Sequence, residues 1–415
     1  MASNMPKPRQ RQVHPIRAAV ERWTTTLNTG PLNEPQAWRE SLINSAPKRF
    51  TVYEPMVLLP SGSFSGTAWV GALARCDVEA RERLWRLILD ELSKSAKTTL
   101  TNLAINGGIP LQSEGGDAEN VLRSPSRLKM LFGDFGPAQP AHDPPSAADF
   151  DAAFWVSTKQ NGIYQTWAPR WTMFSRGNVK EKARLLEFPR AVAGEAGGGG
   201  GGDGDDDVWA LDLYAGIGYF VLCYAALGMR VLCWEINPWS VEGLRRGARA
   251  NGRSVRVVQG GTADPARATR SWVRPRRGEP DGSGGEGRED IIVFLESNEH
   301  AASRVAELQG ATGAAAAAAR MVWHVNCGYL PSSEPTWRPA WEMARWSREA
   351  WLHLHENVGA ADTETRRDEI QRRFTDWGET EEGRGRSAAV EHVELVKTFA
   401  PGVWHCVFDV HITRV

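Results

Sequence analysis

The sequence has few cysteines, and their spacing carries no metal or disulfide motif. Five cysteines occur in 415 residues, and none of them forms a Cys-x-x-Cys pair. The pattern argues against a disulfide framework and against a zinc site, so we expect no metal. Unpaired thiols are typical of a reducing compartment, which predicts a cytoplasmic location. The five residues are Cys76, Cys223, Cys233, Cys327 and Cys406.

The sequence also lacks a long apolar run and an excess of charge of one sign. Residues 1–22 carry basic side chains among Pro and Gln, in place of the apolar core of a signal peptide. Residues 208–227 are apolar overall, but Asp212 and two glycines within them would be costly in lipid, so no membrane association is expected. The 49 Lys and Arg against 50 Asp and Glu exclude a uniformly basic nucleic-acid binder, yet they are compatible with a local basic patch.

Composition divides the chain into three regions. Residues 1–45 are polar and basic, and we expect them to form a flexible arm. Residues 46–150 contain apolar residues at strand and helix spacing, which predicts a smaller N-terminal α+β region. Residues 151–415 form the third region. Within it, the Gly- and Asp-rich stretch near 194–207 and the Arg- and Gly-rich stretch near 253–289 are expected to be loop insertions.

From Val208 onward, short apolar runs alternate with runs of helical periodicity. This alternation is typical of a parallel sheet with crossover helices and predicts an α/β, Rossmann-like, doubly wound fold. The last two apolar runs have no helix between them, which predicts an antiparallel C-terminal hairpin at the sheet edge. The expected strands are 208–213, 230–234, 291–295, 321–326, 351–356, 390–397 and 404–412.

The strongest local motif is a glycine-rich turn after the first strand of this region. The strand ends at Asp212, and Gly216 and Gly218 allow the backbone to turn sharply before a helix begins. Glu235 ends the next strand, where a carboxylate can accept hydrogen bonds from ribose hydroxyls. The dinucleotide motif would need Gly or Ala at Val221, so the pattern favours S-adenosylmethionine over NAD. The alternative is a glycine-rich turn with an acidic residue nearby by chance.

Polar residues also follow the next two strands. Ser297 and Asn298 come directly after the third strand, where a doubly wound fold presents polar atoms to adenine, although either residue could simply cap a helix. His324 and Asn326 lie at the end of the fourth strand and are our candidates for catalytic residues that orient a base. A buried structural role for His324 remains the alternative.

A run of alternating basic and aromatic residues precedes the glycine-rich turn. Cations can bind phosphates and flat rings can stack on unpaired bases, so the run suits RNA. We expect Arg170, Lys180 and Arg184 to contact RNA. A solvated helix face would explain the cations but not the rings. The run comprises Trp167, Arg170, Trp171, Phe174, Arg176, Lys180, Lys182 and Arg184.

Several separated blocks together resemble the fungal tRNA wybutosine-synthesizing protein 2 family. The blocks are QNGIYQTWAP from Gln160, TMFSRGN from Thr172, EK at Glu181, DLYAGIGYF from Asp212, CWEINPWSVEGLRRGA from Cys233, ESNEHAASR from Glu296 and HVNCGYLPSS from His324. The similarity runs from about residue 150 to about residue 412. Over residues 1–150 it is weaker and rests on short pieces such as YEPMVLLP from Tyr53.

The resemblance implies a class I S-adenosylmethionine-dependent methyltransferase-like fold and a transferase that moves the 3-amino-3-carboxypropyl group. The acceptor would be C7 of 4-demethylwyosine in tRNA-Phe, the by-product methylthioadenosine, and the N-terminal region would contact the tRNA. Ser175, Arg176 and Lys182 would meet the methionine end of the cofactor, Glu235 the ribose, and Ser297 with Asn298 the adenine. The full set of expected cofactor-binding residues is Ser175, Arg176, Lys182, Asp212, Tyr214, Gly216, Gly218, Glu235, Ser297 and Asn298.

Such a reaction needs positioning more than acid–base catalysis. All three carbons on a sulfonium are electrophilic, so the one in line with the nucleophile is transferred. The leaving thioether is neutral, and we expect no catalytic triad and a monomeric enzyme. Two alternatives stay open: a tRNA guanine methyltransferase with the same fold, and a non-catalytic tRNA-binding scaffold.

Overall fold

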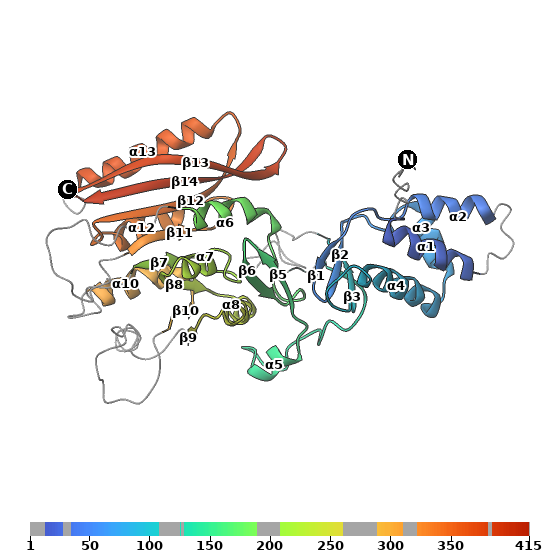
Figure 1. Ribbon diagram of the computed structural model, residues 1–415. Helices are drawn as coiled ribbons and strands as arrows, with labels where there is room; N and C mark the ends of the chain where they lie inside the picture. Colours follow the sequence, from blue (N-terminus) through green and yellow to red (C-terminus); the bar gives the residue numbers. More distant parts are fainter. Residues whose placement is uncertain are drawn as a thin grey trace, which may run out of the picture. The chain divides into compact units, whose positions relative to one another are not determined.

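The computed structural model describes residues 13–27, 35–107, 125, 128–188, 208–259, 289–309, 322–380 and 384–414. The chain divides into two compact units (Figure 1). The first unit comprises residues 1–158 and 168–173, and the second comprises residues 159–167 and 174–415. The first unit therefore ends slightly later than the boundary expected at residue 150, and a short segment after β6 also belongs to it. The expected insertion at 194–207 lies outside the described residues.

The expected arm at residues 1–45 differs from the structure over its described part. Helix α1 (Pro15–Thr26) and helix α2 (Pro35–Asn44) pack into the core of the first unit. Trp23 of α1 is fully buried, and its indole N–H donates a hydrogen bond to the Ala80 carbonyl. The basic composition masked a helical stripe of Ile16, Ala19, Val20 and Trp23.

The rest of the first unit is an α+β region, as expected. Four short strands pair in the order β1-β2-β3-β4, with β2 and β3 parallel and the outer pairs antiparallel. Apolar faces of the helices pack on this sheet in one core. The elements are β1 (Thr51–Tyr53), β2 (Met56–Leu59), α3 (Thr67–Arg75), α4 (Val78–Ser93), β3 (Asn102–Ile105), β4 (Lys129–Phe132) and α5 (Ala147–Ala152).

The second unit is built on an eight-stranded sheet, counted over the described residues. Its order is β13-β14-β12-β11-β7-β8-β10-β9. The six strands from β12 to β9 run parallel, and β14 is antiparallel to both β12 and β13. The strands are β7 (Trp209–Asp212), β8 (Arg230–Glu235), β9 (Val255–Gln259), β10 (Ile291–Leu295), β11 (Val322–Cys327), β12 (Glu349–Gly359), β13 (Arg386–Ala400) and β14 (Val403–Arg414).

This topology confirms the expected doubly wound fold with a C-terminal edge hairpin. One expectation is wrong in part: residues 253–289 are not all a loop insertion. Val255–Gln259 forms the edge strand β9, because its valines pair and pack beside β10. Residues 260–288 lie outside the described residues.

Helices cover both faces of the sheet (Figure 1). Three of them, α10, α12 and α13, contribute apolar side chains to the core on one face, and α6, α7 and α8 contribute to a separate core that includes the other face. These helices are α6 (Val179–Leu186), α7 (Val221–Ala226), α8 (Pro238–Ala250), α10 (Ala301–Gln309), α12 (Trp337–Met343) and α13 (Thr363–Glu379). A two-stranded sheet of β5 (Val156–Gln160) and β6 (Ile163–Trp167) comes before α6 in the chain.

Helix α6 is tied to the C-terminal hairpin by a buried ion pair. Arg184 donates two hydrogen bonds to Asp409 of β14, at 2.5 and 3.1 Å, and a further pair to Glu181 of its own helix. Asp409 also accepts a hydrogen bond from His353 Nδ1 at 2.7 Å. Burial would raise the pKa of Asp409, but its contact with His353 and the positive charge of Arg184 hold that pKa below its usual value.

We predict that Asp409→Asn destabilises the protein strongly. The substitution keeps the shape of the side chain but leaves the buried Arg184 guanidinium without its second carboxylate, and losing one partner of a buried pair costs about 3 kcal/mol. Urea unfolding monitored by fluorescence measures this loss. The matched control is Glu364→Gln, whose carboxylate is 82% exposed and pairs with Arg367 at 3.8 Å. The control should change the free energy of unfolding by less than about 0.5 kcal/mol, and equal effects of the two variants would contradict the role of the buried pair.

Candidate functional site

The glycine-rich turn after β7 is fixed to the end of β8 by a carboxylate. Gly216 and Gly218 both have positive φ angles, +53° and +89°, which favour glycine. The Gly216 N–H donates to Glu235 Oε2 at 2.8 Å, and the Asn237 N–H donates to Glu235 Oε1 at 2.8 Å. Burial raises the pKa of Glu235. Its two oxygens each retain a lone pair for a further hydrogen bond.

Asp212 presents a buried, partly unpaired carboxylate at the end of β7. Its Oδ1 accepts hydrogen bonds from Asn326 Nδ2 at 3.0 Å and from the Tyr214 N–H at 3.1 Å. Its Oδ2 has no hydrogen-bond partner among the described residues. Burial raises the pKa of Asp212 to about 6. A buried carboxylate of this kind favours a ligand that donates hydrogen bonds or carries positive charge.

The ends of two further strands complete this edge of the sheet. Asn298, after β10, donates from Nδ2 to the Leu213 carbonyl at 2.7 Å and so contacts the glycine-rich turn. Ser297 caps the short helical turn that follows, because its hydroxyl accepts from the Glu299 N–H. The ring of Tyr214 stacks on Tyr329 at 5.2 Å. The predicted residues that follow β7, β8, β10 and β11 are therefore brought together, as carboxyl ends of parallel strands are in such folds.

A segment from before the sheet joins the same place through Tyr219. The Ser175 N–H donates to the Tyr219 hydroxyl at 3.0 Å, and the rings of Phe174 and Tyr219 stack at 6.1 Å. The Lys182 ammonium lies 5.8 Å from the centre of the Tyr219 ring. Arg176 begins the short 3-10 helix at Arg176–Asn178 that leads into α6.

Lys182 is a buried cation without a carboxylate partner among the described residues. It is 2% exposed and donates only to neutral oxygens, the side-chain carbonyls of Gln160 at 2.5 Å and Gln165 at 2.7 Å. Burial lowers its pKa to about 8. An uncompensated buried ammonium favours an anionic ligand nearby.

The structure places His324 in the core, away from any open space. Its ring is fully buried, bonded at 2.9 Å to His353, and packed against Tyr224 and Phe188. Burial and the neighbouring His353 lower the pKa of His324 well below its usual value. This geometry fits the alternative interpretation of His324, a buried residue with a structural role. Asn326, two residues on, instead links Asp212 to His355, whose Nε2 lies 3.2 Å from Asn326 Oδ1.

The three cations expected to contact RNA all have partners within the protein. Arg184 is held by Glu181 and Asp409, as described above. Lys180 pairs with Glu394 at 2.5 Å but remains 64% exposed. Arg170 belongs to the first unit and points its guanidinium at two backbone carbonyls there, at 3.4 Å. The guanidinium of Arg184 is therefore used to hold α6 in place, whereas we had expected it to contact RNA. Lys180 keeps an exposed charge.

Three residues at this place had no prior role in the sequence analysis. Tyr219 was part of the glycine-rich motif, so its position was signalled although its hydroxyl contact was not. His355 and Lys397 come from the long C-terminal strands. Lys397 of β13 lies 222 residues from its partner Ser175 in the sequence, and no local pattern marks such a contact.

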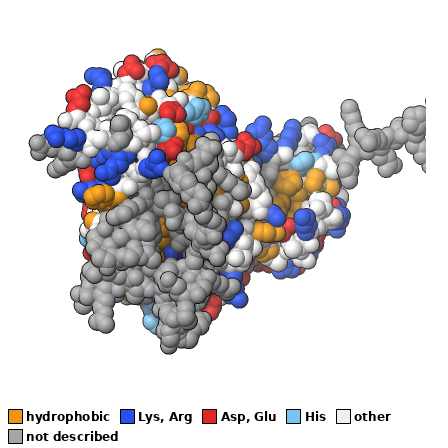
Figure 2. Space-filling view, turned by 60° about the vertical axis from the view of Figure 1, so that its left-hand side comes forward, with side chains coloured by type: hydrophobic (Ala, Val, Ile, Leu, Met, Phe, Trp, Pro, Cys, Tyr) orange, Lys and Arg blue, Asp and Glu red, His pale blue; other side chains and the backbone are white. Residues whose placement is uncertain are grey.

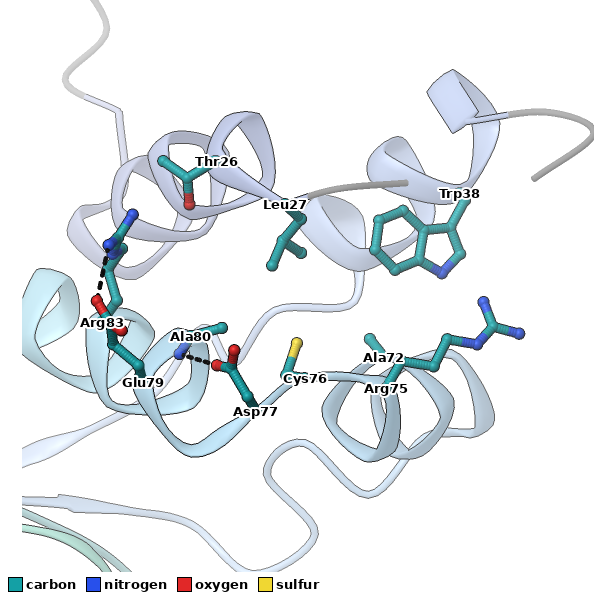
Figure 3. Close-up of a pocket in the computed structure, with 10 residues that line it drawn as sticks. All are labelled: Thr26, Leu27, Trp38, Ala72, Arg75, Cys76, Asp77, Glu79, Ala80 and Arg83. Atoms are coloured by element: carbon teal, nitrogen blue, oxygen red, sulfur yellow. Dashed lines mark hydrogen bonds and ion pairs between the residues drawn. The ribbon is translucent and has the colours of Figure 1, made fainter. Parts of the chain in front are cut away.

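A separate pocket of about 350 Å³ lies in the first unit (Figure 3). It is lined by the ends of α1, α3 and α4 together with Trp38 of α2. Within it, Asp77 caps α4 by accepting from the Ala80 N–H, and Arg83 pairs with Glu79. The lining includes no predicted site residue, so the pocket is not the candidate site.

The described residues show no sign of a metal or a membrane span. No group of three or more His, Cys, Asp or Glu side chains there is placed to hold a metal ion. None of the helices within the described ranges is long and apolar enough to cross a membrane. On the face drawn in Figure 2, Lys and Arg side chains are interspersed with Asp and Glu.

The fold and the strand-end site define an S-adenosylmethionine-dependent transferase of the class I methyltransferase-like fold. No family model matches the chain. Two solved structures share its fold: the crystal structure of P. horikoshii TYW2 in complex with MeSAdo, with a TM-score of 0.54, and a transferase from the same organism, with a TM-score of 0.55. Each is 16% identical to the chain and covers 96% of it, over 100% of its own length.

Curated relatives give the more specific identity. The tRNA wybutosine-synthesizing protein 2 of Schizosaccharomyces pombe is 38% identical over 369 residues, which is 88% of this chain and 72% of the relative. The Saccharomyces cerevisiae protein of the same name is 31% identical over 405 residues, 89% of this chain and 75% of the relative. The chain belongs to the tRNA wybutosine-synthesizing protein 2 family.

We predict that Asp212→Asn stabilises the ligand-free protein in a pH-dependent way. The pKa of Asp212 rises from 3.8 to about 6 on folding, so the folded protein binds more protons between these values and loses stability as the pH rises through that window. Above about pH 6 the ionised carboxylate costs up to about 3 kcal/mol, which the neutral amide avoids. Urea unfolding should show the variant to be more stable at about pH 7, with the difference shrinking towards about pH 4. A difference that stays constant over this range would contradict the assignment.

Proposed function

We propose that this chain transfers the 3-amino-3-carboxypropyl group of S-adenosylmethionine to C7 of 4-demethylwyosine in tRNA-Phe. The reaction leaves methylthioadenosine and is a step of wybutosine biosynthesis. Membership of the family supports this function, and the observation that carries it is the buried ammonium of Lys182, which lies near Tyr219 of the glycine-rich turn and has no carboxylate partner among the described residues. A plain nucleoside has no amino-acid arm. The positive charge of Lys182 suits the carboxylate of that arm, which is the part of the cofactor that this reaction transfers.

The charges at the site fit both ends of a zwitterionic arm. Lys182 supplies a positive charge for the α-carboxylate, and it has no carboxylate partner among the described residues. The buried Asp212 Oδ2, which lacks a hydrogen-bond donor there, supplies a negative charge for the α-ammonium or the sulfonium. Ser175 and Arg176 lie at the same end through the Ser175–Tyr219 contact. We propose these four residues for the methionine end of the cofactor.

The nucleoside end fits the strand termini. Both Glu235 oxygens are already held by backbone N–H groups, which aims their free lone pairs in fixed directions, as hydrogen bonds to two ribose hydroxyls require. Gly216 and Gly218 keep the turn free of side chains. Asn298, which is tied to the turn through Leu213, and its neighbour Ser297 are proposed for the adenine, and Tyr214 for the wall beside it.

Selectivity among the carbons bonded to sulfur then comes from positioning. When bound, the cofactor supplies an electrophilic carbon next to a cationic sulfur. The protein holds the arm by its charged ends and the ribose by Glu235, which determines the carbon that faces the base. No strong acid is needed, because the departing thioether is neutral. His324 is too enclosed to reach a base, and Asn326 acts by orienting Asp212.

The RNA-binding role rests on fewer features. Lys180 is exposed on α6, and Arg170 belongs to the first unit, so we propose both for phosphate contacts and the first unit for docking the tRNA. We also propose that the enzyme is monomeric. All five cysteines are unpaired, which supports a cytoplasmic location.

Labelled cofactor tests the function directly. The protein is mixed with tRNA carrying 4-demethylwyosine and with S-adenosylmethionine labelled in either the methyl or the carboxypropyl carbons. We expect label in the RNA from the carboxypropyl carbons alone, and methyl label in methylthioadenosine. RNA labelled only from the methyl group would identify a guanine methyltransferase. RNA with no label from either, despite tRNA binding, would identify a non-catalytic scaffold.

We predict that Glu235→Ala weakens S-adenosylmethionine binding by roughly 1 to 3 kcal/mol, the usual loss for hydrogen bonds to a charged group. Isothermal titration calorimetry measures this change. The matched control is Glu369→Ala, which removes an acidic side chain of α13 that is 46% exposed and pairs with Arg366 at 3.1 Å. The control should bind as the parent does. An unchanged affinity in Glu235→Ala would contradict the ribose role.

A further inference from the structure

We propose that Lys397 of the C-terminal hairpin is a further cofactor-binding residue that holds the carboxylate of the transferred group. The proposal rests on the proposed function, since it assigns another contact to the same amino-acid arm. It also gives the edge hairpin a part in selectivity. No sequence motif had pointed to this residue.

The position of Lys397 follows from the register of the hairpin. Strand β13 pairs antiparallel with β14, and Lys397 lies directly opposite His405. From there its ammonium reaches the segment that precedes α6, lying 3.2 Å from Ser175 Oγ and 3.3 Å from Asn178 Oδ1. Ser175 is also the residue whose N–H contacts Tyr219 of the glycine-rich turn. Lys397 and Lys182 therefore approach the same Ser175–Tyr219 contact from different elements.

Gly177 leaves the space that this lysine occupies. A Cβ atom added to Gly177 would lie 2.3 Å from Cδ and 2.7 Å from Nζ of Lys397. Any larger residue at position 177 would therefore push the lysine side chain aside. The chain thus combines a lysine on β13 with a residue small enough to admit it beside Ser175.

The charge of Lys397 is uncompensated among the described residues. Its hydrogen-bond partners there are the neutral oxygens of Ser175 and Asn178, and no carboxylate of the described residues lies within ion-pair distance of it. Burial lowers the pKa of Lys397, and burial also lowers the pKa of the neighbouring His405 to about 4, so that imidazole is neutral at pH 7 and does not compensate the charge of Lys397. A half-buried ammonium surrounded by neutral groups is stabilised when an anion binds. The only anionic group of S-adenosylmethionine is the carboxylate of the group to be transferred.

Two ligands that differ in this group separate a binding role from a structural one. S-adenosylmethionine has the amino-acid arm, and methylthioadenosine lacks it while keeping the nucleoside. For Lys397→Met, calorimetry should show at least a tenfold weaker affinity for S-adenosylmethionine and an unchanged affinity for methylthioadenosine. Lys397→Arg should recover part of the loss, because it restores the charge. Gly177→Ala should resemble Lys397→Met, because it displaces the same ammonium.

The control is Lys159→Met, which removes a lysine of the same unit that lies over the Tyr164 ring. It should bind both ligands as the parent does. Equal weakening of both ligands in Lys397→Met would show a merely structural lysine and overturn the proposal, as would unchanged binding of S-adenosylmethionine. These are binding measurements without tRNA. If the parent protein bound the cofactor but transferred its methyl group, the proposed function would be refuted. The binding result for Lys397 could still be interpreted.

Discussion

The ion pair between Arg184 and Asp409 is the contact on which the site depends most. The segment from Phe174 to Lys182 precedes the eight-stranded sheet in the sequence and contributes no strand to that sheet. Helix α6 holds this segment in place, and α6 is fixed by Arg184 to the β14 strand at the far end of the chain. Because both charges are buried and satisfied by further hydrogen bonds, the helix has one docked position. That position brings Ser175 and Lys182 to the glycine-rich turn.

Several groups around this turn are held in electrostatically unfavourable states. Asp212 is ionised at neutral pH although burial raises its pKa, and Lys182 and Lys397 are cations without carboxylates among the described residues. Such groups lower the stability of the ligand-free fold. They are compensated together only by a ligand with opposite charges close to each other, and the zwitterionic arm of S-adenosylmethionine has this property. In the proposed binding mode, we therefore expect the same charges that destabilise the free protein to favour the intact cofactor over methylthioadenosine.

The sequence predicted most of the second unit, because the relevant signals there are local. The alternation of apolar runs indicated the class of fold, and the end of the second strand of this region at Glu235 was predicted correctly. Other features were missed where two local signals conflicted. In α1 the basic composition outweighed an apolar stripe, and in β9 a short run of valines was hidden by neighbouring Arg and Gly. The contact of Lys397 with Ser175 depends on the register of a hairpin and the docking of a helix, and neither can be inferred from residues near it in the chain.

This arrangement also explains how one fold can serve different transfers. In the proposed binding mode, the glycine-rich turn and Glu235 hold the nucleoside, which any reaction of this cofactor shares. The arm is proposed to meet Asp212 of β7 and, in addition, α6 and the edge hairpin, which lie apart from the strand ends that meet the nucleoside. We expect changes in α6 or in the hairpin to reorient the arm while the contacts at Glu235 are kept. The choice of the transferred carbon then depends on the docking of these peripheral elements together with Asp212.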